Sequence, residues 1–179
     1  MILTGGAIDE CVKKGDVIIE PYSPENLNPN SYNFHLGDYV LVYRNMILDP
    51  KLPQPVERVD IPDEGLVLYP DRIYLGYIRE RMGSEKYVPI INGRSSTGRL
   101  GLFVHITANL IDIGSINNWT LQMHAVQPVR VYRGMSIGQV TFWRTYGDIK
   151  LYDGKYKDSS GPVESQIWKD FQQYSNDKK

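Results

Sequence analysis

Apolar residues follow a helical spacing only near the N-terminus of the chain. After Thr4, a residue typical of helix N-caps, the apolar positions between residues 7 and 12 recur three or four apart. Gly15 stands where such a helix would end, because glycine readily adopts the left-handed backbone conformation of a C-cap. The pattern predicts one short helix that begins after Thr4 and ends at Lys14.

Most of the remaining chain consists of short runs rich in β-branched and aromatic residues, bounded by Pro, Gly, Asn or Asp, which is typical of strands. These runs cover residues 17–20, 31–36, 39–43, 66–69, 73–79, 88–91, 102–107, 119–125, 129–132 and 137–143. Four prolines between Asp49 and Gly65 indicate a surface excursion, to which we assign no regular structure. The pattern predicts a mainly β fold, a distorted barrel or jelly roll.

The length of 179 residues and a hydrophobic content of 41% predict a single domain over residues 1–179, ending in a polar tail from about residue 150. A net charge of −1 gives no sign of a basic nucleic-acid-binding surface or of a membrane anchor, so a small guest is expected. Cys11 is the only cysteine, which excludes a disulfide framework and a Cys-rich zinc site. No apolar run is long enough to span a membrane, and a cytoplasmic protein is expected.

The segment Gly93–Gly101 is the main candidate for binding chemistry. It contains two arginines, three hydroxyl side chains and three glycines between apolar runs. Glycines let a backbone approach an oxyanion, and the guanidinium groups of Arg94 and Arg99 can form forked, charge-assisted hydrogen bonds with phosphate. This composition indicates a polyphosphate cradle, although a surface turn with solvated arginines has the same composition.

Several further segments, taken together with this one, resemble the dCTP deaminase branch of the dUTPase superfamily. In chain order they cover residues 30–37, 93–102, 104–112, 119–122, 134–139 and 154–165, and the resemblance extends from about residue 5 to residue 170. It implies a distorted β-barrel that assembles as a homotrimer, or as a hexamer built from two trimers, with active sites between subunits. It also implies a deoxypyrimidine nucleoside triphosphate as substrate, with Mg²⁺ on its phosphates and no metal held by protein ligands.

The same resemblance assigns roles to individual residues. Ser95 would hold the attacking water together with the backbone of Ala108, and Arg99 would orient that water. Ile111 and Asp112 would lie against the deoxyribose. The other substrate-binding residues would be Arg94 and Ser96 of the cradle, Gln139, and the tail residues Lys155 and Tyr156. By composition alone, the lysines of the tail are equally well explained as a solvated charged run.

One position departs from the family pattern in a way that affects the chemistry. The family has a glutamate as general base after Thr-Leu, whereas this chain has Gln122. An amide does not accept a proton from water at neutral pH, and loss of a general base lowers a rate by roughly 10²–10⁴-fold. Gln122 is therefore either an introduced replacement or a natural change of function.

Three functions follow from these observations. The first is a zinc-independent dCTP deaminase that forms dUTP and ammonia, with Gln122 as a disabled base. The second is a dUTP diphosphatase, or a bifunctional enzyme, in which Asp112 activates the water that attacks the α-phosphate. Asp112 before Gly114 also suits a simple turn. The third is a nucleotide-binding or regulatory protein without turnover.

Overall fold

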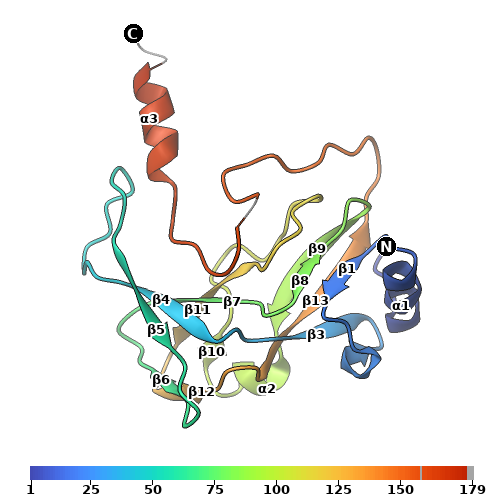
Figure 1. Ribbon diagram of the computed structural model, residues 1–179, viewed down its shortest axis with the longest axis horizontal. Helices are drawn as coiled ribbons and strands as arrows, with labels where there is room; N and C mark the ends of the chain where they lie inside the picture. The colour runs from blue at the N-terminus through green and yellow to red at the C-terminus, as the bar shows by residue number, and fades with distance from the viewer. Residues whose placement is uncertain (158, 177–179) are drawn as a thin grey trace.

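Antiparallel sheets make up most of the computed structural model, which describes residues 1–157 and 159–176 (Figure 1). The largest sheet has the strand order β10-β11-β7-β4-β5, with bounds Leu102–Phe103, Thr120–Ala125, Tyr74–Tyr77, Tyr39–Tyr43 and Val56–Asp60. A second sheet has the order β2-β3-β13-β9, with bounds Leu27–Asn28, Ser31–His35, Ser136–Arg144 and Tyr87–Gly93. Two small sheets pair β1 with β8 and β6 with β12, with bounds Ile18–Glu20, Arg81–Gly83, Leu66–Leu68 and Val129–Val131. The prediction of a mainly β fold is confirmed.

One cluster of buried side chains joins the two larger sheets. Phe34 of β3 and Phe142 of β13 belong to it, and so do Leu121 and Met123 of β11. All four side chains are fully buried. Because side chains alternate between the two faces of a strand, Thr120 and Gln122 lie on the opposite face of β11, where both are only partly covered.

The predicted N-terminal helix is α1, Gly5–Lys13. The Thr4 hydroxyl accepts a hydrogen bond from the backbone N–H of Ala7 at 3.4 Å, as an N-cap should. Gly15 has a φ of 77°, which is the left-handed conformation expected after the helix. A short 3₁₀ helix, η1, follows at Pro24–Asn26.

The segment between Asp49 and Gly65 contains a strand that the sequence analysis did not assign. Residues 56–60 form β5, which pairs with β4 from Tyr39↔Asp60 to Tyr43↔Val56. The prolines stand outside this strand and do not interrupt it. β5 lies at the edge of its sheet, where a strand needs only one partner.

The predicted strand over residues 102–107 is shorter than expected. Only Leu102 and Phe103 pair with β11, and the chain then turns toward Gln122. The segment before it forms a single helical turn, α2, at Ser95–Gly98.

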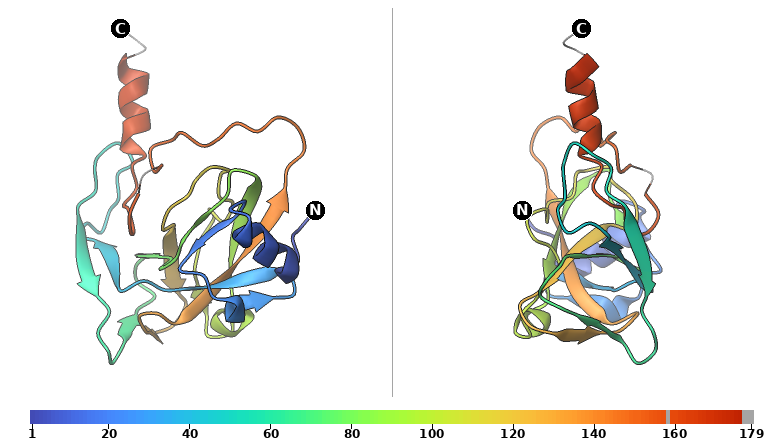
Figure 2. Two further views of the ribbon diagram at one scale, coloured as in Figure 1. Left: turned by 45° about the vertical axis from the view of Figure 1, so that its right-hand side comes forward. Right: turned by 90° about the vertical axis from the view of Figure 1, so that its left-hand side faces the viewer.

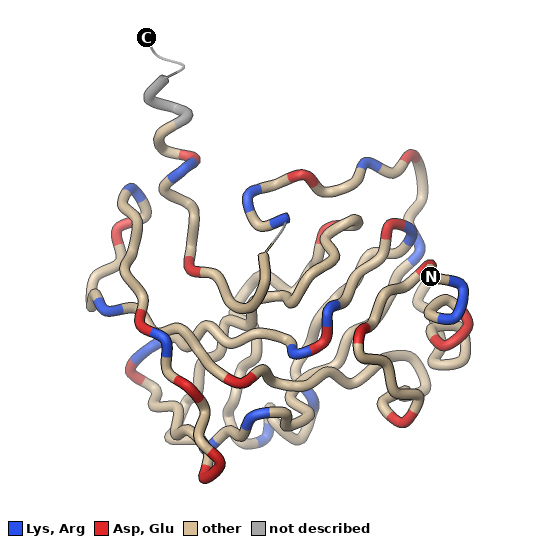
Figure 3. Tube along the Cα trace, viewed as in Figure 1, with Lys and Arg blue, Asp and Glu red and all other residues tan. Residues whose placement is uncertain are grey.

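The tail after β13 crosses one end of the molecule and leads into α3, Trp168–Asn176, which projects away from the sheets (Figures 1 and 2). Acidic and basic residues are interspersed along the trace (Figure 3). No helix in the described part of the chain is long and apolar enough to cross a membrane.

Candidate functional site: a cavity closed by the C-terminal tail

A cavity of about 400 Å³ lies between the exposed face of β11 and the C-terminal tail. Its walls come from β4, β7 and β11, from the segment between residues 108 and 119, and from tail residues between 152 and 165. Five residues predicted for the site line it: Ala108, Ile111, Asp112, Gln122 and Tyr156. The fold thus brings together one half of the predicted site.

Gln122 is the central polar group on the sheet side of this cavity. Its Oε1 accepts a long hydrogen bond, 3.5 Å, from the backbone N–H of Ile106. Its Nε2 has no acceptor among the residues that the structure describes. The amide can therefore donate hydrogen bonds to a guest or to a water molecule, but it does not take up a proton at neutral pH.

Asp112 contributes an exposed carboxylate at another part of the wall. Its backbone carbonyl accepts a hydrogen bond from the N–H of Ser115 at 3.0 Å, so the residue does begin a turn. Its carboxylate forms no hydrogen bond or ion pair within residues 1–157 and 159–176. The backbone of the turn therefore forms no hydrogen bond with the Asp112 carboxylate, which is available to a ligand.

Hydrogen bonds at four points fasten the tail over the cavity. Tyr152 N–H donates to the carbonyl of Ile113 at 2.8 Å, and Asn117 Nδ2 donates to the carbonyl of Tyr156 at 3.2 Å. Two more bonds use side-chain oxygens as acceptors: Val163 N to Thr120 Oγ1 at 3.0 Å and Ser165 N to Tyr43 Oη at 2.9 Å. A further bond, Gln166 N to Tyr156 Oη at 2.9 Å, joins two parts of the tail itself. The tail is thus the lid of the cavity within the same chain.

Sequence reasoning missed two groups that the tail brings into the cavity wall. Glu164 and Tyr43 both line it, although they lie far apart in the sequence. Burial raises the pKa of Tyr43 above its ordinary value, and the negative charge of Glu164 raises it further. A carboxylate inside the 154–165 motif was the available sign of Glu164, but Tyr43 had no such sign.

Two lysines line a second hollow that adjoins the cavity. Its volume is about 270 Å³, and it shares Ser159 and Val163 with the cavity wall. Lys155 and Lys157 lie in this hollow and form ion pairs of 2.5 Å with Asp170 and 2.8 Å with Asp153, respectively. No Lys, Arg or His among the described residues lines the larger cavity, whereas this adjoining hollow carries two lysines.

The arginine cradle lies apart from the cavity. α2 is at one end of the molecule and the tail at the other in all views (Figures 1 and 2). Arg94 Nη1 donates to the carbonyl of Ser136 at 3.4 Å, and Gln139 Oε1 accepts from Ser31 Oγ at 3.2 Å. Ser95, Ser96 and Arg99 are exposed beside them. The predicted site residues therefore form two groups in one chain.

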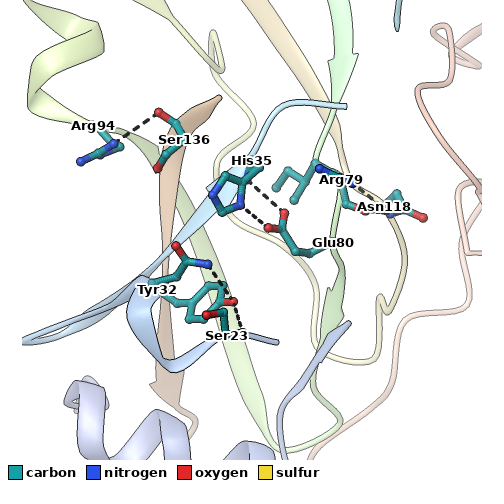
Figure 4. Close-up of polar contacts among 10 residues, drawn as sticks. Ser23, Tyr32, His35, Arg79, Glu80, Arg94, Asn118 and Ser136 are labelled. Carbon is teal, nitrogen blue, oxygen red and sulfur yellow. Dashed lines mark hydrogen bonds and ion pairs between the residues drawn. The ribbon is translucent and has the colours of Figure 1, made fainter. Parts of the chain in front are cut away.

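A buried carboxylate contacts a histidine on the strands next to the cradle (Figure 4). Glu80 is 3% exposed, and its carboxylate accepts from the backbone N–H of His35 at 3.0 Å and contacts His35 Nδ1. His35 is thereby held toward Glu80. No three His, Cys, Asp or Glu side chains gather as a metal site in the described part of the chain.

Comparison with protein families gives a match to the model described as dCTP deaminase-like, over residues 2–145. The chain belongs to the dCTP deaminase-like family. A protein of Clostridium botulinum, named dCTP deaminase, dUMP-forming, is 47% identical over 173 residues, which are 96% of this chain and 99% of that protein. A protein of the same name from Leptospira biflexa is 45% identical over 175 residues, with the same coverage of both chains.

A solved structure shares the fold. The 2′-deoxycytidine 5′-triphosphate deaminase of Agrobacterium tumefaciens superposes with a TM-score of 0.63 at 23% sequence identity, covering 79% of this chain and 47% of that one. The family resemblance predicted from the sequence motifs is confirmed. Within this family the chain carries Gln122 and Asp112 on the wall of one cavity.

Proposed function

We propose that this chain is a dCTP deaminase that forms dUMP. The overall reaction would be dCTP + 2 H₂O → dUMP + NH₃ + diphosphate, with one water attacking C4 of the cytosine and the other the α-phosphate. Relatives at 45–47% identity over nearly the full chain bear the name of this reaction. The carrying observation is that Gln122 and the carboxylate of Asp112 line the same cavity. The first function inferred from the sequence was deamination of dCTP to dUTP. We now prefer the bifunctional alternative, in which Asp112 also activates the water that attacks the α-phosphate.

The shapes and charges of the two hollows support a division of the nucleotide between them. The cavity, with its aromatic and amide walls, suits the base and the deoxyribose. The adjoining hollow, with Lys155 and Lys157, suits phosphate oxygens. Mg²⁺ would be bound by the phosphates and would neutralise charge that developed on them. Ile111 beside Asp112 would lie against the sugar.

The separate arginine cradle supports a site completed by a second copy of the chain. Arg94, Ser95, Ser96, Arg99 and Gln139 of one subunit would face the cavity of the next, as in the homotrimer or dimer of trimers that the sequence resemblance implies. Large apolar side chains are exposed in the single chain along the segment that runs from the cradle to the cavity wall: Leu100 52%, Phe103 54%, Ile106 52% and Leu110 61%. Exposed apolar groups of this kind are typical of surfaces that pack against another subunit.

The test has two parts. First, the chain is incubated with Mg²⁺ and dCTP, and ammonia, dUTP, dUMP and diphosphate are measured. Ammonia with dUMP is expected, whereas the absence of ammonia would contradict the proposal. Second, Arg94→Ala and Asp112→Asn, each expected to be inactive in dUMP formation, are mixed after partial unfolding. Because a mixed assembly contains some sites with both residues intact, activity should reappear only if the site lies between copies.

A second candidate is a nucleotide-binding protein without turnover, and Gln122 is the observation that favours it. The same assay separates the two functions. Tight binding of dCTP with no product over many hours would support the binding protein.

A further inference from the structure

The cavity contains few groups that can accept a proton. Its titratable side chains, from every element that lines it, are Tyr43, Asp112, Tyr152, Tyr156 and Glu164. Phenols are protonated near neutral pH, and the Gln122 amide is not a base. Asp112 and Glu164 are therefore the only described residues of this wall that can take a proton from water.

The position of Glu164 is set on both sides by the main chain. The N–H of Val163 is bound to Thr120 Oγ1 at 3.0 Å, and the N–H of Ser165 is bound to Tyr43 Oη at 2.9 Å. Thr120 and Gln122 lie on the same face of β11, about 7 Å apart along the strand. Glu164 thus directly follows Val163, the residue bound to Thr120, and Thr120 is the neighbour of Gln122 on this face of β11.

The surroundings of Glu164 fit a carboxylate directed at the guest. Glu164 is half-buried, and the structure gives its carboxylate no hydrogen bond or ion pair with any described residue. Its charge acts on Tyr43, which is also in the cavity wall. A half-buried carboxylate on the lid that has no partner among the described residues is available to a bound water molecule.

Both carboxylates lie near the lysine hollow, and burial distinguishes them. Val163, the residue before Glu164, lines the hollow. The carbonyl of Ile113, the residue after Asp112, accepts the N–H of Tyr152, which stands two residues before Gly154 of that hollow. Asp112 is exposed and suits the water at the phosphates, whereas Glu164 is half-buried beside the Gln122 face of β11 and suits the water at the base.

We propose that Glu164 is the general base for deamination, in place of the carboxylate that Gln122 does not provide. This inference rests on the proposed function. The Glu164 carboxylate takes one proton from a water molecule while the water oxygen forms a bond to C4 of cytosine and the C4=N3 double bond opens, and the protonated Glu164 delivers that proton to N3. Glu164 then takes the second proton from the new C4 hydroxyl and delivers it to the N4 amino group. The C4–N4 bond breaks to release ammonia, and C4 becomes a carbonyl carbon. Gln122 Nε2 orients the water by donating a hydrogen bond to its oxygen.

The test uses the full chain and matched variants. Glu164→Gln removes the base and keeps the shape of the side chain, whereas Asp112→Asn removes the other carboxylate. Gln122→Glu is made alone and together with Glu164→Gln. Asp148→Asn is the control, because Asp148 is an exposed acid of the same C-terminal segment that does not line the cavity. Ammonia release from dCTP measures deamination alone, and dUMP release from dUTP measures phosphate cleavage alone.

We expect Glu164→Gln to lower kcat for ammonia release by about 10²–10⁴-fold with little change in KM, because a base acts on the transition state and contributes little to substrate binding. The rise of kcat with pH that reports the base should disappear in this variant. dUMP release from dUTP should continue, which also shows that the variant folds. Adding Gln122→Glu to Glu164→Gln should restore ammonia release, and the control Asp148→Asn should leave ammonia release unchanged.

The outcomes separate this inference from the proposed function. Equal kcat for ammonia release in the parent chain and in Glu164→Gln would overturn the role of Glu164 and leave the deaminase intact. A low kcat with an unchanged pH profile, or a fall explained by KM alone, would also overturn it, because Glu164 would then only support binding. No ammonia from the parent chain would contradict the proposed function itself.

Discussion

The lid should open more readily when its two side-chain acceptors on the sheet are removed. Thr120→Val and Tyr43→Phe each delete one acceptor, for the N–H groups of Val163 and Ser165, with little change in shape. A neutral hydrogen bond of this kind contributes about 1 kcal/mol net, so each variant should raise the equilibrium constant for tail opening by roughly fivefold. The double variant should raise it by about 30-fold if the two effects add.

The assay is amide hydrogen exchange at Tyr152. Its acceptor is the carbonyl of Ile113, outside the tail, which neither substitution changes, so faster exchange there reports opening of the tail beyond the two altered points. Tyr132→Phe is the control, because this exposed tyrosine does not line the cavity. If the Tyr152 amide exchanges within twofold of the parent rate in the double variant, the two hydrogen bonds do not hold the lid, and the reasoning is refuted.

Three further results are expected. Leu121→Ala, beneath Gln122 in the core, should lower the free energy of unfolding by about 2–5 kcal/mol in a denaturant titration, and a loss below 1 kcal/mol would contradict full burial. Gly138→Ala should destabilise the chain by at least about 1–3 kcal/mol, because its Cβ would lie 2.1 Å from Phe34 Cζ, whereas Gly6→Ala, with no atom within 4 Å, should not. Burial lowers the pKa of His105 below its ordinary value of 6.5, so the unfolded chain takes up that proton first and stability should fall as pH drops below about 6.5. His105→Asn should remove this part of the pH dependence.

Local pattern was sufficient for most of the regular structure. The run 39–43 is β4 with unchanged bounds, and 119–125 contains β11, because alternation and β-branched residues act over a few neighbours. β5 was missed because an edge strand with one buried neighbour carries little alternation of its own. Its stability comes from pairing with β4, and sequence reading does not supply that partner.

The candidate site was only half predictable for a similar reason. Motifs identified Gln122 on β11 and Asp112 in the segment that leads into β11. Glu164 and Tyr43 enter the same wall only because the tail folds back, and the bond from Ser165 to Tyr43 joins residues 122 positions apart. Composition identified the cradle around Arg94. It does not predict that the cradle and the cavity lie at opposite ends of the chain's fold.

The way the lid is fastened has a consequence for how this sequence can change. At residues 163 and 165 the donors are main-chain amides, so almost any side chain except proline keeps those bonds, whereas Thr120 and Tyr43 must keep their hydroxyl groups. The side chain of residue 164 can therefore change while the backbone on both sides of it stays bound. Substitutions there can replace one chemical group with another above the cavity while the chain path stays the same, which gives evolution a place to exchange chemistry without rebuilding the protein.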